Sequence, residues 1–318
     1  MGPDLFIVSI SCITFNQKPF IRKAIEGFLI QKTTFPIEVL IHDDASTDGT
    51  DQIIREYEAK YPDIIKPIYQ KENQWKKGRR PGLEFNYPRA KGKYIAICEG
   101  DDYWTDPFKL QKQVDFLEKN PHCGMVYTDY DLFDERTKAT QRNLLKNNQK
   151  IQNTFEDFLI NRWPIPPCTW MFRASIFNLI ARPLLENNVV GDLPLILGLS
   201  RYSKIAYIDE NTAVYRVLEK SASHFDTLKK EYEFLPGVLS IQFKFASYFE
   251  VPENIILKIK DNFYAEYFIS ICLFGDKQIK EEAYDRLKKN GLNTIKHRLI
   301  FILTKFKITG KLVLWYYN

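Results

Sequence analysis

Cysteine is scarce in this 318-residue sequence, which excludes a disulfide-stapled scaffold. The five cysteines are far apart, odd in number, and none belongs to a C-x-x-C pair. Most lie among apolar residues, which is typical of reduced cysteines that act as small core residues in a cytosolic protein. They are Cys12, Cys98, Cys123, Cys168 and Cys272.

Long hydrophobic runs are also missing. No stretch approaches the roughly 20 consecutive apolar residues that a membrane-spanning helix requires. Residues 5–13 (LFIVSISCI) are apolar, but the run is short and has neither a basic leader nor a cleavage site. We therefore expect a protein that is neither secreted nor integral to a membrane.

Positive charge is not concentrated over most of the chain. The 45 lysines and arginines against 40 acidic residues give a net charge of +5, and their scatter does not predict a nucleic-acid partner. The composition is 45% hydrophobic and 14% aromatic, which is sufficient for a large buried core. The length suits one large domain with an appendage, or two domains.

Strand and helix patterns alternate through the first half of the chain. Apolar, β-rich runs at residues 6–14, 37–44, 64–70, 93–99 and 124–133 predict strands. Helical periodicity or capping residues predict helices at 18–32, 45–61 and 106–120. Such alternation predicts an α/β fold with a mostly parallel sheet flanked by helices. Residues 136–153 are polar and basic and read as a surface excursion, and residues 226–290 look helical.

Two acidic clusters follow predicted strands. Asp43 and Asp44 end the second strand, and Glu99, Asp101 and Asp102 end the strand at 93–99. Ligands bind at the carboxyl ends of strands in such sheets. The two clusters should therefore lie on one rim of the sheet, although about 55 residues separate them.

The first cluster, HDDASTDGT (residues 42–50), has two readings. Asp44 and Ser46 are able to cap the following helix, which is a structural role. A carboxylate at a strand end is also able to accept hydrogen bonds from a nucleotide base or ribose. The residues alone leave both readings open.

The second cluster indicates a cation more strongly. Mg2+ and Mn2+ prefer hard oxygen ligands, commonly one or two carboxylates with phosphates and water completing the shell. Asp101 and Asp102, with Glu99 nearby, supply such a partial shell. The alternative is an acidic turn that caps the next helix, but Thr105 or Asp106 would be enough for that role.

In residues 5 to about 130, VSISCITFNQKPF, IEVLIHDDASTDGT and YIAICEGDDYWTDP resemble, in this order, the family 2 glycosyltransferases. A looser resemblance continues through residues 189–223. The resemblance implies a GT-A (Rossmann-like) fold and an inverting glycosyltransferase of the bacterial surface-polysaccharide type. It also implies a nucleotide-sugar donor, most often a UDP-sugar, a saccharide or lipid-linked acceptor, and Mn2+ or Mg2+ as cofactor.

The resemblance also assigns roles to individual residues. Asp43 matches the acid that recognises the base, Asp101 and Asp102 match the DXD position that binds ribose and the metal–diphosphate, and Asp192 matches the general base. The alternative for Asp192 is a helix N-cap, and the two roles are compatible. Nucleotide-binding positions are completed by Thr14, Phe15, Asn16, Asp44 and Ser46.

One position departs from the family pattern. Arg216 lies in a YR element that the family places near the diphosphate. Relatives often carry a histidine two residues later, where this chain has Leu218. His224 is the candidate replacement, so the third metal ligand is left open.

Aromatic and basic segments complete the candidate site. Trp104 either packs against the next helix or offers a sugar platform, and Trp170 lies in a Pro-rich segment (163–173) that the family places beside the acceptor. Residues 72–82 (ENQWKKGRRPG) either supply cations to the diphosphate or form a solvated loop.

The last 24 residues contain five basic residues and no acid: Lys296, Arg298, Lys305, Lys307 and Lys311. They form either a packed helix with a basic face or an attachment to an anionic inner membrane surface. We expect a catalytic domain over residues 1–225 and a helical region over 226–318. A sugar nucleotidyltransferase and a non-catalytic nucleotide-sugar or glycan-binding module are the alternative functions; the residues after the first strand (TFNQKPF) lack the glycines typical of the former.

Overall fold

A computed structural model describes residues 7–148, 153–162, 165–218, 227–292 and 295–305. The chain divides into two compact units. The first comprises Met1–Phe158 and Arg162–Glu219, and the second comprises Leu159–Asn161 and Lys220–Asn318. His224 lies outside the described residues.

The first unit begins with four parallel strands. β1 lies between β2 and β4, and β3 extends the sheet beyond β2. The side chains of β1, β2 and β4 are almost all buried, as expected for parallel strands covered on both faces. The bounds are β1 (Val8–Thr14), α1 (Ile21–Leu29), β2 (Ile37–Asp43), α2 (Thr50–Lys60), β3 (Ile65–Tyr69), the π-helix η1 (Gly82–Asn86), α3 (Tyr87–Arg89) and β4 (Tyr94–Ile97).

The rest of the sheet is mixed. β8 (Met171–Arg173) lies between β4 and β6 (Cys123–Asp134) and runs antiparallel to both. β6 pairs in parallel with the long strand β9 (Lys204–Val217), whose other edge carries the two-residue β5 (Tyr103–Trp104) in antiparallel pairing. The α/β fold is therefore confirmed, but four of the eight strand pairings among the described residues are antiparallel. A three-residue strand such as β8 carries too little periodicity to reveal its direction from sequence.

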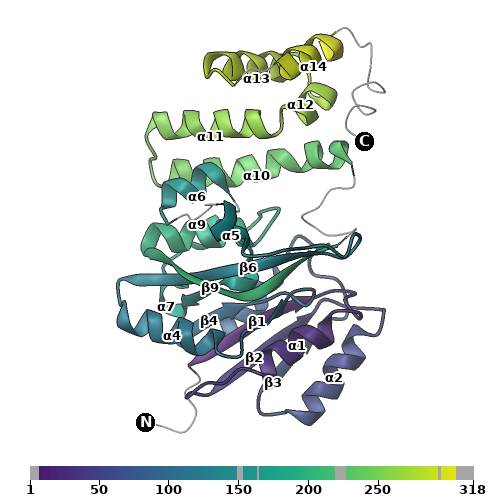
Figure 1. The fold of residues 1–318 in the computed structure, drawn as a ribbon, viewed down its shortest axis with the longest axis vertical. Coiled ribbons are helices and arrows are strands. Elements are labelled where there is room, and N and C mark those ends of the chain that lie inside the picture. The colour runs from purple at the N-terminus through teal and green to yellow at the C-terminus, as the bar shows by residue number, and fades with distance from the viewer. Residues whose placement is uncertain (1–6, 149–152, 163–164, 219–226, 293–294, 306–318) are drawn as a thin grey trace. The chain divides into compact units, whose positions relative to one another are not determined.

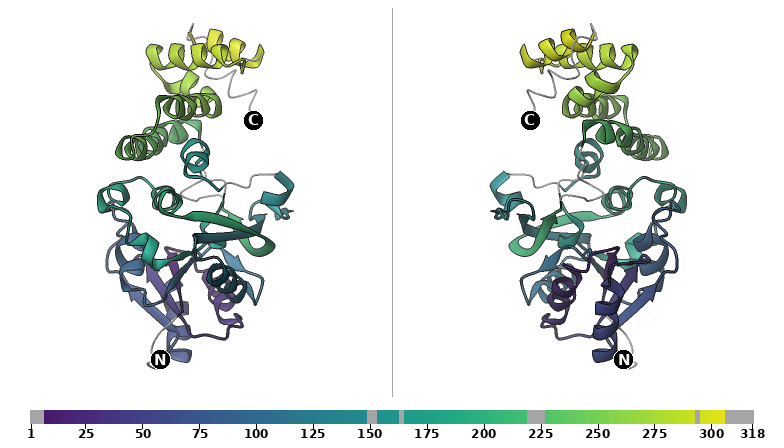
Figure 2. Two further views of the ribbon diagram at one scale, coloured as in Figure 1. Left: turned by 90° about the vertical axis from the view of Figure 1, so that its left-hand side faces the viewer. Right: turned by 90° about the vertical axis from the view of Figure 1, so that its right-hand side faces the viewer.

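Helices pack against the β3 part of this sheet and against its β6 part (Figures 1 and 2). α1 and α2 lie side by side next to the β1–β3 part of the sheet, and α4 lies against β6. α9 is buried at every residue from Leu193 to Ser200. The bounds are α4 (Lys109–Lys119), α6 (Phe155–Asn161), the 3-10 helix η2 (Pro167–Thr169), α7 (Ala174–Phe177), α8 (Arg182–Leu185) and α9 (Asp192–Tyr202).

The polar segment after β6 is ordered where the structure describes it. It contains β7 (Thr140–Gln141), which pairs with the end of β6, and the short helix α5 (Leu144–Asn148). The Asp129 carboxylate accepts hydrogen bonds from the backbone N–H groups of Leu145 (2.9 Å) and Lys146 (3.1 Å). Asp129, a buried acid of β6, thus anchors the start of α5, in the segment that the composition predicts to be a surface excursion.

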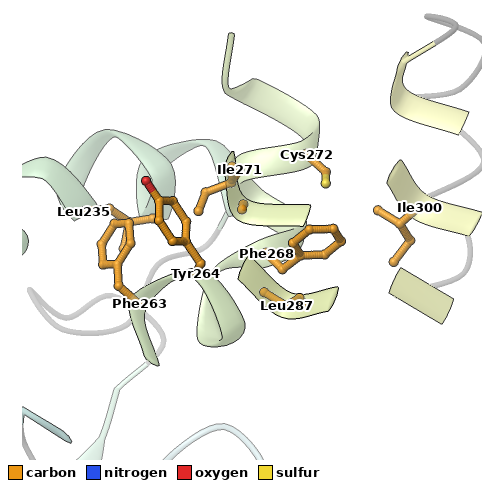
Figure 3. Packing of buried hydrophobic residues seen from close by; sticks show 9 residues of the cluster. Leu235, Phe263, Tyr264, Phe268, Ile271, Cys272, Leu287 and Ile300 are labelled. Atoms are coloured by element: carbon orange, nitrogen blue, oxygen red, sulfur yellow. The ribbon is translucent and has the colours of Figure 1, made fainter. Parts of the chain in front are cut away.

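The second unit is helical. Its elements are α10 (Leu228–Tyr248), α11 (Glu253–Glu266), α12 (Phe268–Phe274), α13 (Lys277–Lys289) and α14 (Ile295–Lys305). Figure 3 shows their shared core, in which Phe268 and Ile271 of α12 meet Leu287 of α13 and Ile300 of α14. Within the described residues, no helix combines the length and apolar character needed to cross a membrane.

A buried lysine links α4 to the turn before β8. Lys109 is fully buried, and its ammonium donates to the Gln113 side-chain oxygen (2.8 Å) and the Thr169 carbonyl (3.2 Å). The nearby Trp104 indole donates to the Cys168 carbonyl (2.8 Å). Burial lowers the pKa of Lys109 to about 7 because the charged form is poorly solvated there.

Lys109→Met should therefore change the pH dependence of stability. Between the folded pKa near 7 and the unfolded pKa near 10.4, Lys109 binds more protons in the unfolded state than in the folded state, so its contribution to stability rises with pH. The methionine variant lacks this gain. Across that window, the free energy of unfolding of wild type should therefore rise by a few kcal/mol relative to that of Lys109→Met. Urea unfolding at pH 7 and pH 9.5 measures it. The matched exposed variant Lys119→Met should show no such drift, and a constant Lys109→Met difference would contradict the assignment.

Candidate active site

The ends of β1 and β2 form one side of the candidate site. Thr14 and Asp43 are the last residues of their strands and are partners in the parallel register. Asp43 is buried. Its Oδ2 accepts from the Ser46 N–H (3.2 Å), whereas Oδ1 has no hydrogen-bond partner. Burial raises the pKa of Asp43. An acceptor is therefore left available at the rim.

The loops after these two strands are tied together. Asn16 has a positive φ of 51°, its N–H donates to the Ser46 hydroxyl (2.9 Å), and its side-chain oxygen accepts from the Thr47 N–H (2.8 Å). Ser46 and Asn16 therefore shape the loop pair. Phe15, which follows Thr14 at the end of β1, has a ring that is 38% exposed.

Asp44 has a different role from Asp43. Its carboxylate accepts from the backbone N–H groups of Gln74 (2.7 Å) and Trp75 (3.1 Å), and His42 Nε2 lies 3.5 Å away. Both oxygens are thus used within the protein. Asp44 anchors the loop after β3 to the end of β2.

The end of β4 brings the second acidic cluster to the same rim. The Gly100 N–H donates to the Ile13 carbonyl (3.0 Å), which docks this turn against β1. A Cβ at Gly100 would lie only 2.5 Å from Gln17 Oε1 and 2.8 Å from Thr14 Oγ1. These two oxygens and Asp101 Oδ1 are buried without hydrogen-bond partners. A substituted residue 100 would fill the space that they face.

Electrostatics in this cluster oppose full ionisation. Burial and the neighbouring carboxylates Asp101 and Asp192 raise the pKa of Glu99. Burial and the Asp101 charge raise the pKa of Asp102 well above its usual range. Burial also raises the pKa of Asp101. A cation among these groups would relieve the repulsion.

Arg216 supports the acidic turn through its backbone and side chain. Its N–H donates to Asp102 Oδ1 (2.8 Å), its Nε donates to the Asp101 carbonyl (2.6 Å), and it pairs with Glu135. The guanidinium lies 4.7 Å from the Phe20 ring centroid and 5.2 Å from that of Tyr103. These contacts fix the turn, which is a positioning role.

Asp192 approaches the cluster from α9. It is the first residue of that helix, and its Oδ1 accepts from the Leu193 N–H (2.8 Å). In addition to burial and the Asp101 charge, the charge of Asp192 raises the pKa of Glu99. Burial and the charges of Glu99 and Asp192 raise the pKa of Tyr87. The structure thus brings together the strand-end acids and Asp192, which are about 90 residues apart.

Tyr87, Gln17 and Arg80 belong to this site but were not individually predicted. Tyr87 packs edge-on against Phe172 and Phe177, between the acids of β4 and α9. Arg80 lies in the predicted basic loop. Gln17 lies three residues after Thr14, in the loop after the first strand, and that position could have identified it. No sequence signal distinguishes Tyr87.

The two tryptophans are core residues. Trp104 is 2% exposed and Trp170 is 1% exposed. Phe28 contacts the Trp104 ring edge-on at 5.0 Å between centroids. Neither indole offers a face to a sugar, so packing is the role that the geometry supports for both.

The acidic turn offers part of a coordination shell for a divalent cation. The described residues contain no group of three or more His, Cys, Asp or Glu side chains arranged to hold a metal ion. However, Asp101 presents a buried, unpartnered oxygen, and Asp102 lies beside it. Two carboxylates that leave the remaining positions to phosphate and water suit Mg2+ or Mn2+. The donor set therefore fits such an ion as a partial shell.

Comparisons with solved structures agree with this fold. TarS of S. aureus in complex with UDP-GlcNAc has a TM-score of 0.61 at 16% identity, with 95% of this chain and 88% of that chain covered. The mannosyltransferase PcManGT of Pyrobaculum calidifontis, in complex with GDP-Man and Mn2+, has a TM-score of 0.55 at 16% identity, with 97% and 82% covered. The chain therefore has the GT-A fold of these enzymes.

Sequence relatives share a large part of the chain. An uncharacterized protein of Mycobacterium tuberculosis is 34% identical over 227 residues, which cover 66% of this chain and 58% of that protein. The chain thus spans little more than half the length of this relative. A Bacillus subtilis protein, provisionally named as the teichuronic acid biosynthesis glycosyltransferase TuaG, is 34% identical over 220 residues, which cover 68% of this chain and 81% of that protein.

The family model described as "Glycosyl transferase family 2" matches residues 9–180. This match includes Asp43, Asp101 and Asp102 and extends over more than half of the chain. The protein is accordingly a member of glycosyl transferase family 2.

Proposed function

We propose that the first unit transfers a sugar from a nucleotide donor to an acceptor hydroxyl with inversion at the anomeric carbon. The observation that carries the proposal is a set of buried, unpartnered oxygens at three adjacent parallel strand ends: Thr14 Oγ1, Asp43 Oδ1 and Asp101 Oδ1. Buried polar atoms are rarely left unpaired in folded proteins. A polar ligand along this rim would satisfy all three.

The positions of these atoms suit a nucleoside diphosphate. Asp43 Oδ1 would accept a hydrogen bond from the base. The exposed ring of Phe15, which follows the register partner of Asp43, would then be available to pack on the base. Asp101 and Asp102 would hold ribose and a divalent cation. A UDP-sugar is the proposed donor: the name of an Escherichia coli relative, WfaP, 36% identical over 112 residues, describes transfer from UDP-Glc.

The chain's own residues supply the acid–base chemistry. Asp192 would accept the proton of the acceptor hydroxyl as that oxygen attacks the anomeric carbon and the bond to the diphosphate breaks. Arg216 would keep the Asp101–Asp102 turn in position under the leaving group. When bound there, Mn2+ or Mg2+ would neutralise the charge that develops on the diphosphate.

The acceptor is proposed to be a saccharide or a lipid-linked saccharide. The WfaP name specifies a diphosphoundecaprenol-linked acceptor, and the name of TuaG refers to teichuronic acid. A lipid-linked acceptor would require approach to a membrane surface. We propose the inner face of the plasma membrane, reached from the cytoplasm.

The end of the second unit has the chemistry for such an approach. Leu299 and Ile302 on α14 are 55% and 50% exposed, while Ile300 is buried in the helical core. Residues 286–318 contain eight lysines and arginines and no acid. Lys307 and Lys311 of this group lie outside the described residues. Exposed apolar side chains amid positive charge suit an anionic bilayer surface.

Asp192→Asn tests the general base. The amide cannot accept the acceptor's proton, so turnover should fall by roughly 10²–10⁴-fold while UDP binding stays within about twofold of wild type. Nucleoside-diphosphate release from a panel of UDP-sugars and GDP-Man, with and without acceptor, measures turnover and identifies the donor. Asp115→Asn, an exposed acid on α4, is the control. Near-normal transfer by Asp192→Asn would refute the role.

Asp101→Asn tests the cation site. Removing one carboxylate charge should lower the gain in UDP affinity that Mn2+ provides by about tenfold, or about 1.4 kcal/mol. Isothermal titration with UDP, with Mn2+ and then with a chelator, measures the gain independently of turnover. Asp63→Asn, exposed and distant in sequence, should retain the wild-type gain. An unchanged Mn2+ dependence in Asp101→Asn would place the cation elsewhere.

Leu299→Ser with Ile302→Ser tests membrane attachment. Because both side chains are exposed, the variant should fold with wild-type helicity but lose most co-sedimentation with vesicles of anionic phospholipid. Leu257→Ser, an exposed leucine of α11, is the matched control. Equal sedimentation of variant and wild type, or no binding by wild type itself, would end the proposal.

A further inference from the structure

The basic loop between β3 and η1 (residues 72–81) has one cation that differs from the others. Lys77 pairs with Glu72 and Arg79 pairs with Glu84, and all these side chains are at least 30% exposed. Arg80 is partly buried, and burial lowers its pKa. Arg80 therefore packs against the protein, whereas Lys77 and Arg79 lie on the solvent-exposed side of the loop.

The first end of the loop is anchored beside the proposed base-binding acid. Asp44, next to Asp43, accepts from the N–H groups of Gln74 (2.7 Å) and Trp75 (3.1 Å). The Asn73 amide donates back to the Asp44 carbonyl (3.2 Å). Three hydrogen bonds thus fix residues 73–75 to the end of β2.

The other end of the loop reaches the segment before Asp192. The Arg80 guanidinium lies 4.2 Å from the Trp75 ring centroid, and the backbone N–H of Arg80 donates to Glu84 Oε1 (2.7 Å). Arg80 Nη2 donates to the backbone carbonyl of Asn188. Arg80 Cδ lies 3.9 Å from where a Cβ would stand on Gly191. Arg80 therefore bonds to the backbone of Asn188 and passes near Gly191, which directly precedes Asp192.

The position of Asp192 depends on that short segment. On its carboxyl side, α9 is fixed because residues 193–200 are all buried. On its amino side, the chain turns through Asn187, which has a positive φ of 56°, and Asn188, whose side chain donates to the Leu184 carbonyl (2.8 Å). Arg80 adds a contact to this turn from the distant loop after β3.

We propose that Arg80 is a positioning residue for Asp192, and that residues 73–80 form a brace between the donor-binding strand end and the general base. This inference rests on the proposed function. Arg80 acts through the backbone of residues 188–191 and does not touch the reacting atoms. Its hydrogen bond to the Asn188 carbonyl is charge-assisted, and a misplacement of about 1 Å can cost about 10²-fold in rate.

A direct contact between Arg80 and the diphosphate is the competing role, and kinetics separate the two. Loss of a diphosphate contact weakens donor binding. Loss of a brace lowers kcat while donor affinity is kept. Arg80→Ala should lower kcat roughly 10–100-fold with a UDP dissociation constant within about twofold of wild type. Arg55→Ala, which removes an exposed guanidinium of α2 outside this loop, is the matched control and should keep both values.

A double-mutant cycle with Asp192→Asn completes the test. If Arg80 acts through Asp192, adding Arg80→Ala to Asp192→Asn should cause no further loss of kcat. Additive losses would overturn the brace, as would a UDP affinity that falls in parallel with kcat. Normal turnover of Asp192→Asn alone would instead overturn the proposed function. If Arg80→Ala does not fold, Arg80→Lys, which keeps a donor but loses the planar stacking on Trp75, is read by the same criteria.

Discussion

Repulsion among buried carboxylates at the end of β4 is the constraint on which the rest of the site depends. Glu99, Asp101 and Asp102 follow a strand whose side chains are buried, and each has a raised pKa because it is poorly solvated. Such a turn keeps its shape only if other elements hold it. Arg216 holds it from β9, and the Ile13 carbonyl of β1 holds it by accepting from the Gly100 N–H. The fold therefore keeps three carboxyl groups close together, and a cationic ligand would stabilise their ionised forms.

The two sides of the rim are built differently. On the β1–β2 side, side chains such as Asn16 and Ser46 bond to backbone groups and shape the loops, and Asp43 keeps a free acceptor. On the β4 side, hydrogen bonds to Arg216 and to β1 hold a turn that carries three carboxyl groups. This division agrees with a ligand that has a neutral, hydrogen-bonding base at one end and a charged diphosphate at the other.

Much of this arrangement could be predicted from the sequence, because the parallel strands and their acidic ends have a clear pattern. The proximity of Asp43 to the acidic turn follows from topology alone. The direction of β8 did not follow, since three residues carry no usable period. The separate tasks of Asp43 and Asp44 did not follow either, because adjacent identical side chains differ only in the partners that the fold supplies. Arg80 and Tyr87 reach the site through tertiary packing that no local pattern encodes.

The reversal of direction at β8 has a consequence for how the enzyme could diversify. The acids at the ends of β2 and β4 lie before this reversal, whereas Asp192 and Arg216 come after it, beyond residue 180 where the family match ends. Under the proposed function, the acids that would bind the donor and the residue that would act as general base therefore lie in separate stretches of the chain. Because Arg216 in the later stretch also holds the Asp101–Asp102 turn, substitutions in that stretch would leave the donor side unchanged only where Arg216 is kept.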